Sequence, residues 1–145
     1  MLDIYNKPEF TITYLACERG FAASTDSDIE QPEFGGEVPS DIESMMRLPG
    51  VGRKTANVVG AVIWGKEVMP VDTHVFRVSA RIGLTRNAKT PLQTELQLEK
   101  NIPKHLLPIA HHWLILHGRY TCTARKPKCA ECGIAKWCKS APQAE

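Results

Sequence analysis

The chain has 145 residues, of which 43% are hydrophobic, and its formal net charge is +2. This length can bury the core of one globular domain, and no apolar run reaches membrane length, so the sequence excludes a membrane-spanning protein. The charges are separated: residues 1–43 hold two basic and ten acidic side chains, net −8, so the other 102 residues carry net +10. Such a basic body indicates a polyanion partner, although lysines kept for solubility would give the same charge.

The first 35 residues form an acidic segment with weak periodicity. We expect a short strand or helix at residues 11–16, a loop at residues 24–33, and an inert, buried thiol at Cys17. No basic stretch followed by an apolar run opens the chain, so the sequence indicates no secretion signal. We therefore expect a cytoplasmic protein with reduced thiols.

Two short helices joined by a glycine hairpin are predicted next. Ser40 and Glu43 have the spacing of a capping box, which predicts a helix beginning directly after Ser40. The run 48–52, Leu-Pro-Gly-Val-Gly, must end it, because proline disfavours helical geometry at the residue before it and glycine tolerates positive φ. A second helix is expected over residues 53–64, with Val51 as the apolar plug between the two helices.

The hairpin has the features of a phosphate site. Its glycines let a ligand approach the backbone, and the first N–H groups of the second helix lack partners within that helix. Such a helix N-terminus attracts anions, phosphate above all. An ordinary turn between core helices would contain the same glycines, but Arg53 and Lys54 follow at once and favour a phosphodiester partner.

Three more helices are predicted, without any strand pattern, so the expected fold class is all-α. Asp72 can cap a helix over residues 73–82, and a proline at the first position begins another over residues 91–102. Apolar residues at helical spacing predict a third over residues 106–118. The inward stripe of the first of these helices is expected to be Val75, Val78, Ser79 and Ile82. Structural roles without metal ligation are expected for His74, His111, His112 and His117.

Four cysteines are crowded into 17 residues near the C-terminus, namely Cys122, Cys129, Cys132 and Cys138. The odd total of five cysteines and this crowding argue against a secreted disulfide framework and indicate a metal centre. The gaps of six, two and five residues differ from the paired Cys-x-x-Cys of zinc ribbons and from ferredoxin runs. Spacing alone favours one iron–sulfur cluster held by all four cysteines, with a zinc site as the alternative.

Two runs of the sequence resemble the helix-hairpin-helix DNA glycosylases, and the endonuclease III branch of that family in particular: Leu48-Pro-Gly-Val-Gly-Arg-Lys-Thr-Ala-Asn-Val-Val59 and Val71-Asp-Thr-His-Val-Phe-Arg77. The resemblance covers residues 36–139. Members of the family have several helices before the hairpin, and too few residues precede it here for that set. We therefore expect a truncated or divergent form that has the family's fold only in part.

The resemblance also implies an organisation and a cofactor. The chain divides into an unmatched acidic segment at 1–35, a helical region at 36–118 with its hairpin at about 40–64, an iron–sulfur loop at 119–139 and a tail at 140–145. The family holds a [4Fe-4S] cluster with this cysteine spacing. We expect the cluster to clasp a basic loop against DNA. The implied DNA contacts are Leu48, Pro49, Gly50, Val51, Gly52, Arg53, Arg125, Lys126 and Lys128.

Lys54 and Asp72 are the catalytic residues that the resemblance implies. A neutral lysine amine can attack the sugar of a nucleotide flipped out of the stack, displace the base and remain as a Schiff base, after which β-elimination nicks the strand. Asp72 would stabilise positive charge on the sugar or activate the attacking group. Adenine-removing relatives lack this lysine, so Lys54 implies a glycosylase and AP lyase for oxidised pyrimidines. A solvated lysine and a plain N-cap are the alternatives.

Two other functions stay open from the sequence. The chain can be a DNA-binding fragment without a formed catalytic pocket, or a zinc-binding interaction module, which would be colourless instead of brown. The implied partner is double-stranded DNA with damaged or abasic sites. The implied setting is a bacterial cytoplasm, where a monomer with no membrane association would join the nucleoid when bound to DNA.

Overall fold

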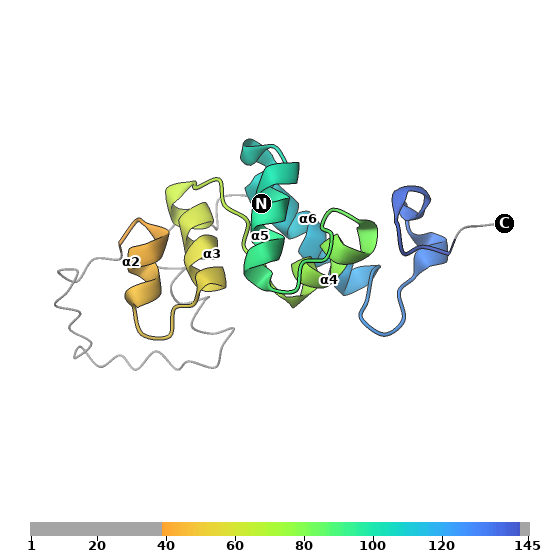
Figure 1. Cartoon of the computed structure of the whole chain (residues 1–145), viewed down its shortest axis with the longest axis horizontal. Coiled ribbons are helices and arrows are strands. Elements are labelled where there is room, and N and C mark those ends of the chain that lie inside the picture. Colours follow the sequence, from red (N-terminus) through yellow and green to blue (C-terminus); the bar gives the residue numbers. More distant parts are fainter. Residues whose placement is uncertain (1–38, 143–145) are drawn as a thin grey trace. The chain divides into compact units, whose positions relative to one another are not determined.

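The computed structural model describes residues 39–142, which form helices and short loops and contain no strand (Figure 1). The all-α class is confirmed for this part of the chain. The acidic segment at 1–35 and Cys17 lie outside the described residues. The helices are α2 (Ile42–Arg47), α3 (Arg53–Trp64), α4 (Thr73–Ile82), α5 (Pro91–Asn101) and α6 (Leu107–Tyr120), and the 3₁₀ turns are η3 (Lys104–Leu106), η4 (Cys129–Glu131) and η5 (Ala135–Trp137).

The described residues divide into two compact units at residue 66. We call residues 39–66 the hairpin unit and residues 67–142 the cysteine unit. None of the helices in these two units is long and apolar enough to cross a membrane.

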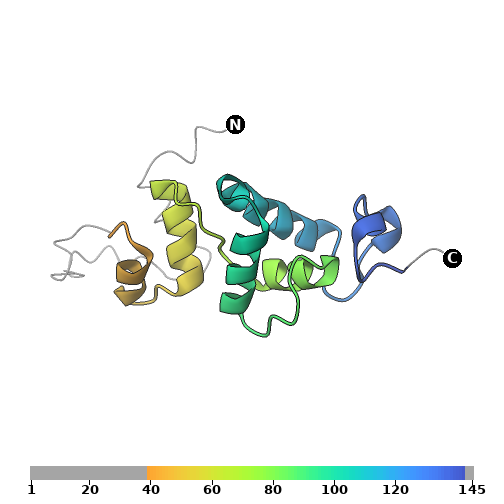
Figure 2. The ribbon, with the colours of Figure 1, turned by 45° about the horizontal axis from the view of Figure 1, so that its top comes forward.

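The hairpin unit consists of α2 and α3, which lie side by side (Figures 1 and 2). Helix α2 is capped by Asp41, whose Oδ1 accepts a hydrogen bond from the Ser44 N–H at 2.8 Å. The predicted cap, Ser40, was therefore wrong by one residue. Both residues have the spacing for a cap, but the carboxylate is the stronger acceptor and takes the role.

A small apolar core holds the two helices of the hairpin unit together. It is formed by Met45, Ala56 and Val59, with Ile42, Val51, Ile63 and Trp64 packed against it. Gly60 allows the close approach of the helices, because a Cβ there would lie 2.8 Å from the Ile42 Cδ1 atom. Val51 contributes to this core as predicted, but it is one of several apolar contacts and not the single plug.

The cysteine unit is built around α4 and α6. Asp72 caps α4 through a 2.8 Å hydrogen bond from the Val75 N–H, and Gly83 ends the helix with φ +93°. The predicted inward stripe is confirmed, since Val75, Val78 and Ser79 are fully buried and Ile82 packs, partly buried, against the same core. Gly118 on α6 lets the two helices meet, because a Cβ there would lie 3.0 Å from the Val78 Cγ2 atom. The rest of this core is Met69, Val71, Leu98, Leu107, Ala110 and Leu114.

Helix α6 differs from its prediction in which face is buried. Leu107, Ala110 and Leu114 point into the core, whereas Ile109 and Trp113, which recur at helical spacing with Ala110 and Leu114 in the sequence, are 42% and 56% exposed. The contact of Gly118 with α4 fixes the rotation of α6 about its axis, so it decides which face of α6 is buried. The apolar pattern of α6 does not reveal this contact. Residues 104–106 form the separate turn η3, so α6 begins at Leu107.

Helix α5 begins as its sequence predicts. The Thr90 hydroxyl accepts a hydrogen bond from the Gln93 N–H at 3.2 Å. The Gln93 side chain reaches back to the Lys89 N–H at 2.8 Å, one residue before the position that a capping box would use. The helix ends at Asn101, directly before Ile102 and Pro103, which agrees with the predicted boundary within one residue.

Candidate functional site

The four C-terminal cysteines of the cysteine unit line one cavity. Ile82, His117 and Ala141 also contribute to its wall. The thiols are half-buried and form no disulfide. The cysteines that the structure brings together here are Cys122, Cys129, Cys132 and Cys138.

Short backbone turns bring these cysteines to the cavity. The Lys128 N–H donates to the Thr121 carbonyl at 2.9 Å, which closes the longest gap into a loop. The Cys132 N–H donates to the Cys129 carbonyl at 3.2 Å, and a matching 3.1 Å bond from the Cys138 N–H closes the turn η5. The segment thus consists of short turns that bring its cysteines to one cavity, while its Ile134 and Trp137 side chains are exposed.

The donor set fits an iron–sulfur cluster. Four cysteine thiolates are the usual ligands of a [4Fe-4S] cluster. A single zinc ion would need its ligand atoms within about 2.0–2.3 Å of one point. Among residues 39–142, no three cysteine, histidine or acidic side chains are gathered in that way. The four cysteines line one cavity instead, and they are the residues that would hold an iron–sulfur cluster.

Two arginines on α4 contact the cysteine segment. Arg77 donates from Nη2 to the Gly118 carbonyl at 2.9 Å and to the Cys122 carbonyl at 3.2 Å. Arg81 donates to the carbonyls of Thr123 and Ala124 and lies beside the Cys122 sulfur. Neither arginine was assigned a role from the sequence. The partners lie 41 to 45 residues further along the chain, so no local pattern could have revealed them.

His117 also lies at the cavity, with Nε2 3.8 Å from the Cys132 sulfur. Burial lowers the pKa of His117 below its usual value of 6.5, because it disfavours the charged form of the ring. His111 has the purely structural role that was predicted, since its Nδ1 lies 2.8 Å from the Pro70 carbonyl inside the core. His74 is oriented by Arg77, with 3.2 Å between its Nδ1 and the guanidinium.

The glycine hairpin presents its backbone to solvent. Gly50 has φ +77°, and a Cβ at Gly50 or Gly52 would meet no atom within 4 Å. Gly52 precedes α3 and makes no side-chain cap hydrogen bond to that helix. Pro49 and Arg53 are exposed, and Leu48 and Val51 are half-buried.

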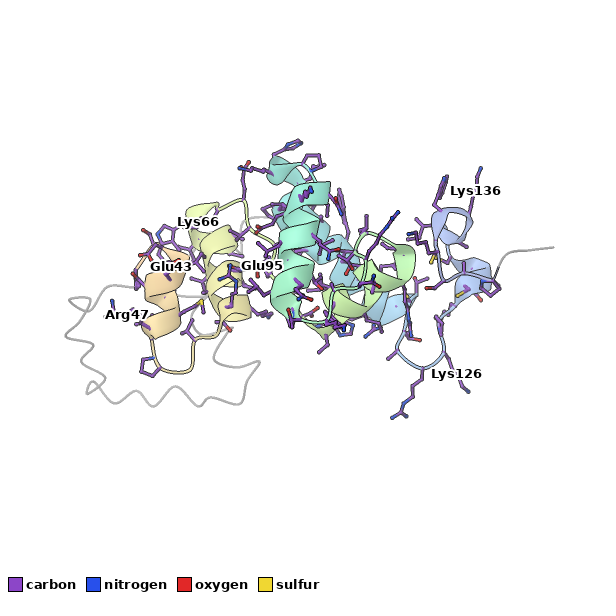
Figure 3. All side chains as sticks on the ribbon, in the orientation of Figure 1. Glu43, Arg47, Lys66, Glu95, Lys126 and Lys136 are labelled. Atoms are coloured by element: carbon purple, nitrogen blue, oxygen red, sulfur yellow. The ribbon has the colours of Figure 1, made fainter. Side chains whose placement is uncertain are left out.

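The basic loop between α6 and η4 is likewise open to solvent. Arg125, Lys126 and Lys128 are all exposed. Lys126 extends away from the loop in Figure 3. A 2.6 Å hydrogen bond from the Thr123 hydroxyl to the Lys126 carbonyl shapes the loop from within.

The two predicted catalytic residues belong to different units. Lys54 lies in the first turn of α3 in the hairpin unit and is half-buried. Asp72 caps α4 in the cysteine unit and is also half-buried, with Oδ1 engaged by the cap. Their pairing stays a prediction, as do the DNA contacts.

Two family models match the chain. The helix-hairpin-helix motif matches residues 33–59, which include the hairpin and the first half of α3. The iron–sulfur binding domain of endonuclease III matches residues 122–138, which begin and end on cysteines of the cavity. The predicted [4Fe-4S] cofactor is confirmed by this second match.

The chain is also similar to known proteins over most of its length. It is 52% identical to endonuclease III of Rickettsia felis over 106 residues, which are 73% of this chain and 49% of the relative. It is 47% identical to endonuclease III of Buchnera aphidicola over 138 residues, 95% of this chain and 59% of the relative. That alignment therefore extends into the acidic N-terminal segment.

The chain is also similar to a solved structure described as a trapped endonuclease III–DNA covalent intermediate, with a TM-score of 0.72 and 46% sequence identity. This match covers 76% of this chain and 52% of the solved chain. The predicted resemblance to endonuclease III is confirmed, and so is the helix-hairpin-helix glycosylase fold for the matched part. The chain spans about half the length of most of the curated relatives that it matches.

Proposed function

We propose that this chain, which resembles endonuclease III in both its hairpin and its cysteine segment, acts in base excision repair. It would remove oxidised pyrimidines as a DNA glycosylase and nick the resulting abasic site as a lyase. The observation that carries the proposal is the presence, in one chain, of the lysine-bearing hairpin, an aspartate-capped α4 and a four-cysteine cavity. Each belongs to a run or segment that matches the same family.

Double-stranded DNA with damaged or abasic sites is the proposed partner. The start of α3, which has no side-chain cap from Gly52, and the open glycine backbone suit a phosphate group, because helix N-termini attract anions. The exposed cations of the basic loop suit a second stretch of the DNA phosphate backbone. We propose that a monomer binds in this way within a bacterial cytoplasm.

The proposed chemistry begins at the Lys54 nitrogen. It bonds to the sugar C1′ as the bond from C1′ to the base breaks, and the base leaves with that electron pair and takes up a proton. Loss of the amine proton and opening of the sugar ring give an imine. Removal of a proton from C2′ then expels the 3′ phosphate and breaks the strand, and water hydrolyses the imine to release the enzyme.

Asp72 is proposed to stabilise the positive charge that develops on the sugar. Its cap hydrogen bond holds the carboxylate at the start of α4, so the charge is oriented before substrate arrives. The covalent complex described for one endonuclease III relative supports chemistry of this kind.

The cysteines of the cavity are proposed as the ligands of the [4Fe-4S] cluster, which would act as a structural clasp. When bound, the cluster ties together a segment that has few apolar residues. The chain's own basic loop, Arg125, Lys126 and Lys128, would then be held in shape for the phosphate backbone.

A second candidate is a protein that binds DNA without processing it. It would need only the exposed glycine backbone of the hairpin and the exposed cations of the basic loop, and no pairing of Lys54 with Asp72. A strand-nicking assay separates the two functions. Purified, cluster-loaded protein should cleave a duplex with one abasic site and leave an undamaged duplex intact. Tight binding of both duplexes without cleavage would contradict the glycosylase and lyase proposal and support the second candidate.

A further inference from the structure

One side chain of α4 contacts both a cysteine sulfur and the basic loop that follows it. Arg81 Nη1 lies 3.5 Å from the Cys122 Sγ and 2.8 Å from the Thr123 carbonyl. Its Nη2 donates to the Ala124 carbonyl at 2.8 Å. The planar guanidinium thus spans three successive residues of the chain, which a lysine ammonium on a flexible stem could not match.

The backbone of Arg81 holds the other end of the cysteine segment. Its carbonyl accepts a hydrogen bond from the Ser140 N–H at 3.2 Å, and the Cys138 thiol lies 3.5 Å from the same oxygen. This carbonyl belongs to the last turn of α4, where helical carbonyls lack partners within the helix. The first and last cysteines of the cavity are therefore both tied to one residue.

Arg77 does not duplicate this arrangement. Its guanidinium donates to the carbonyls of Gly118, in the last turn of α6, and Cys122, two residues after that helix, and none of its described hydrogen bonds goes to residues 123–128 or to a sulfur atom. Among the described hydrogen bonds, those that join residues 123–128 of the basic loop to α4 come from Arg81 alone. Loop shape and sulfur environment are thus set by the same side chain.

We propose that Arg81 is a positioning residue with two separable effects. Its charge and N–H group beside the Cys122 sulfur tune the reduction potential of the cluster, because hydrogen bonds to cluster sulfurs raise that potential. Its two hydrogen bonds to the carbonyls of Thr123 and Ala124 fix the loop that presents Arg125 and Lys126 to DNA. The loop effect rests on the proposed function, whereas the sulfur effect does not.

Two variants separate the effects. Arg81→Gln removes both the positive charge and the pair of hydrogen bonds to the loop carbonyls. Arg81→Lys keeps a positive charge near Cys122 but cannot donate to both loop carbonyls. The matched control is Arg86→Gln, which removes an exposed arginine from the loop after α4.

The experiment uses full-length, cluster-loaded proteins and two readouts. A dye-mediated redox titration, followed by the visible absorbance of the cluster, gives the midpoint potential. Binding to an abasic duplex at several salt concentrations gives the salt slope. Arg81→Gln should lower the potential, weaken binding by roughly tenfold and reduce the slope by about 1 for each phosphate that the loop no longer neutralises. Arg81→Lys should keep the wild-type potential and show the same smaller slope, and the control should match wild type in both.

The outcomes decide the inference. Wild-type potential and slope in Arg81→Gln would overturn it, and so would equal changes in the control. If both Arg81 variants lose iron but keep the circular dichroism of a helical protein, the inference is supported, because the loop then depends on the guanidinium. If they lose iron and helical structure together, the inference is overturned. If wild-type protein binds no DNA, the proposed function fails, and the potential alone decides the sulfur effect.

Discussion

The Asp72 carboxylate lies 2.8 Å from the Val75 N–H, so the side chain proposed to stabilise the sugar also begins helix α4. Substitutions of Asp72 can separate its capping role from its proposed role in the reaction. Asparagine caps helices about as well as aspartate, whereas alanine does not.

Asp72→Asn should keep the stability of the protein and lose activity. The cap hydrogen bond survives, but the charge facing the sugar is gone, and we expect nicking of abasic DNA to fall by a factor on the order of 10². Asp72→Ala should show the same loss and also lower the free energy of unfolding by about 1 kcal/mol. Urea denaturation and single-turnover nicking measure the two effects. Full activity in Asp72→Asn would show that the residue only caps α4.

Asp41 should make the start of α2 sensitive to acid. Hydrogen bonds from the backbone N–H and the side chain of Ser44 hold the pKa of Asp41 below its ordinary value of 3.8. Because the folded pKa is the lower one, the cap contributes its full stability above pH 3.8 and loses it as the pH falls through the folded value. The Ser44 amide resonance should titrate below pH 3.8, and in Asp41→Asn this titration should disappear. A midpoint at or above 3.8 in the native protein would rule out the hydrogen-bonded cap.

Alanine substitutions at the two hairpin glycines should lower the stability of the protein by different amounts, but both should weaken its binding to DNA. Gly50→Ala places a side chain at φ +77° and should cost about 1–2 kcal/mol in unfolding free energy. Gly52→Ala should cost far less, because its φ is −90° and a Cβ there meets no atom within 4 Å. If DNA phosphate approaches this backbone closely, both added methyl groups should weaken binding to an abasic duplex. Unchanged binding in Gly52→Ala would place the phosphate elsewhere.

Removal of iron should affect DNA binding before chemistry. The proposed clasp makes the shape of the basic loop depend on the cluster, whereas the hairpin unit that carries Lys54 does not contain a cysteine among its described residues. Apo protein should show a higher dissociation constant and a smaller salt slope, while the single-turnover nicking rate at saturating protein changes little. Iron and sulfide analysis of the same samples is the control. Equal affinity of apo and loaded protein would contradict the role of the cluster as a clasp.

The sequence predicted those features that depend on residues a few positions apart. Asp72, Thr90 and Gly83 mark helix ends through contacts within four residues, and the structure has each of them in that role. The cap of α2 was misplaced because Ser40 and Asp41 both have suitable spacing, and only geometry shows which oxygen is used. Residue type and spacing were also sufficient to predict that the four cysteines share one site.

Features that depend on distant contacts could not be predicted in this way. The buried face of α6 follows from the meeting of Gly118 with α4, and neither helix encodes that contact alone. Arg81 and the loop that it holds are about 42 residues apart. The side chain of His117 was interpreted as structural, yet it lies beside Cys132, because the cysteine segment folds back onto the end of α6.

Borohydride trapping tests the central claim most directly, because reduction of an imine between Lys54 and the sugar leaves a permanent bond between protein and DNA. The matched control is Lys66→Ala, which removes another half-buried lysine of the hairpin unit. With an abasic duplex, wild type and Lys66→Ala should both give a cross-linked species on a denaturing gel, and Lys54→Ala should give none. Equal cross-linking by Lys54→Ala and wild type would contradict the assignment of Lys54 as the nucleophile.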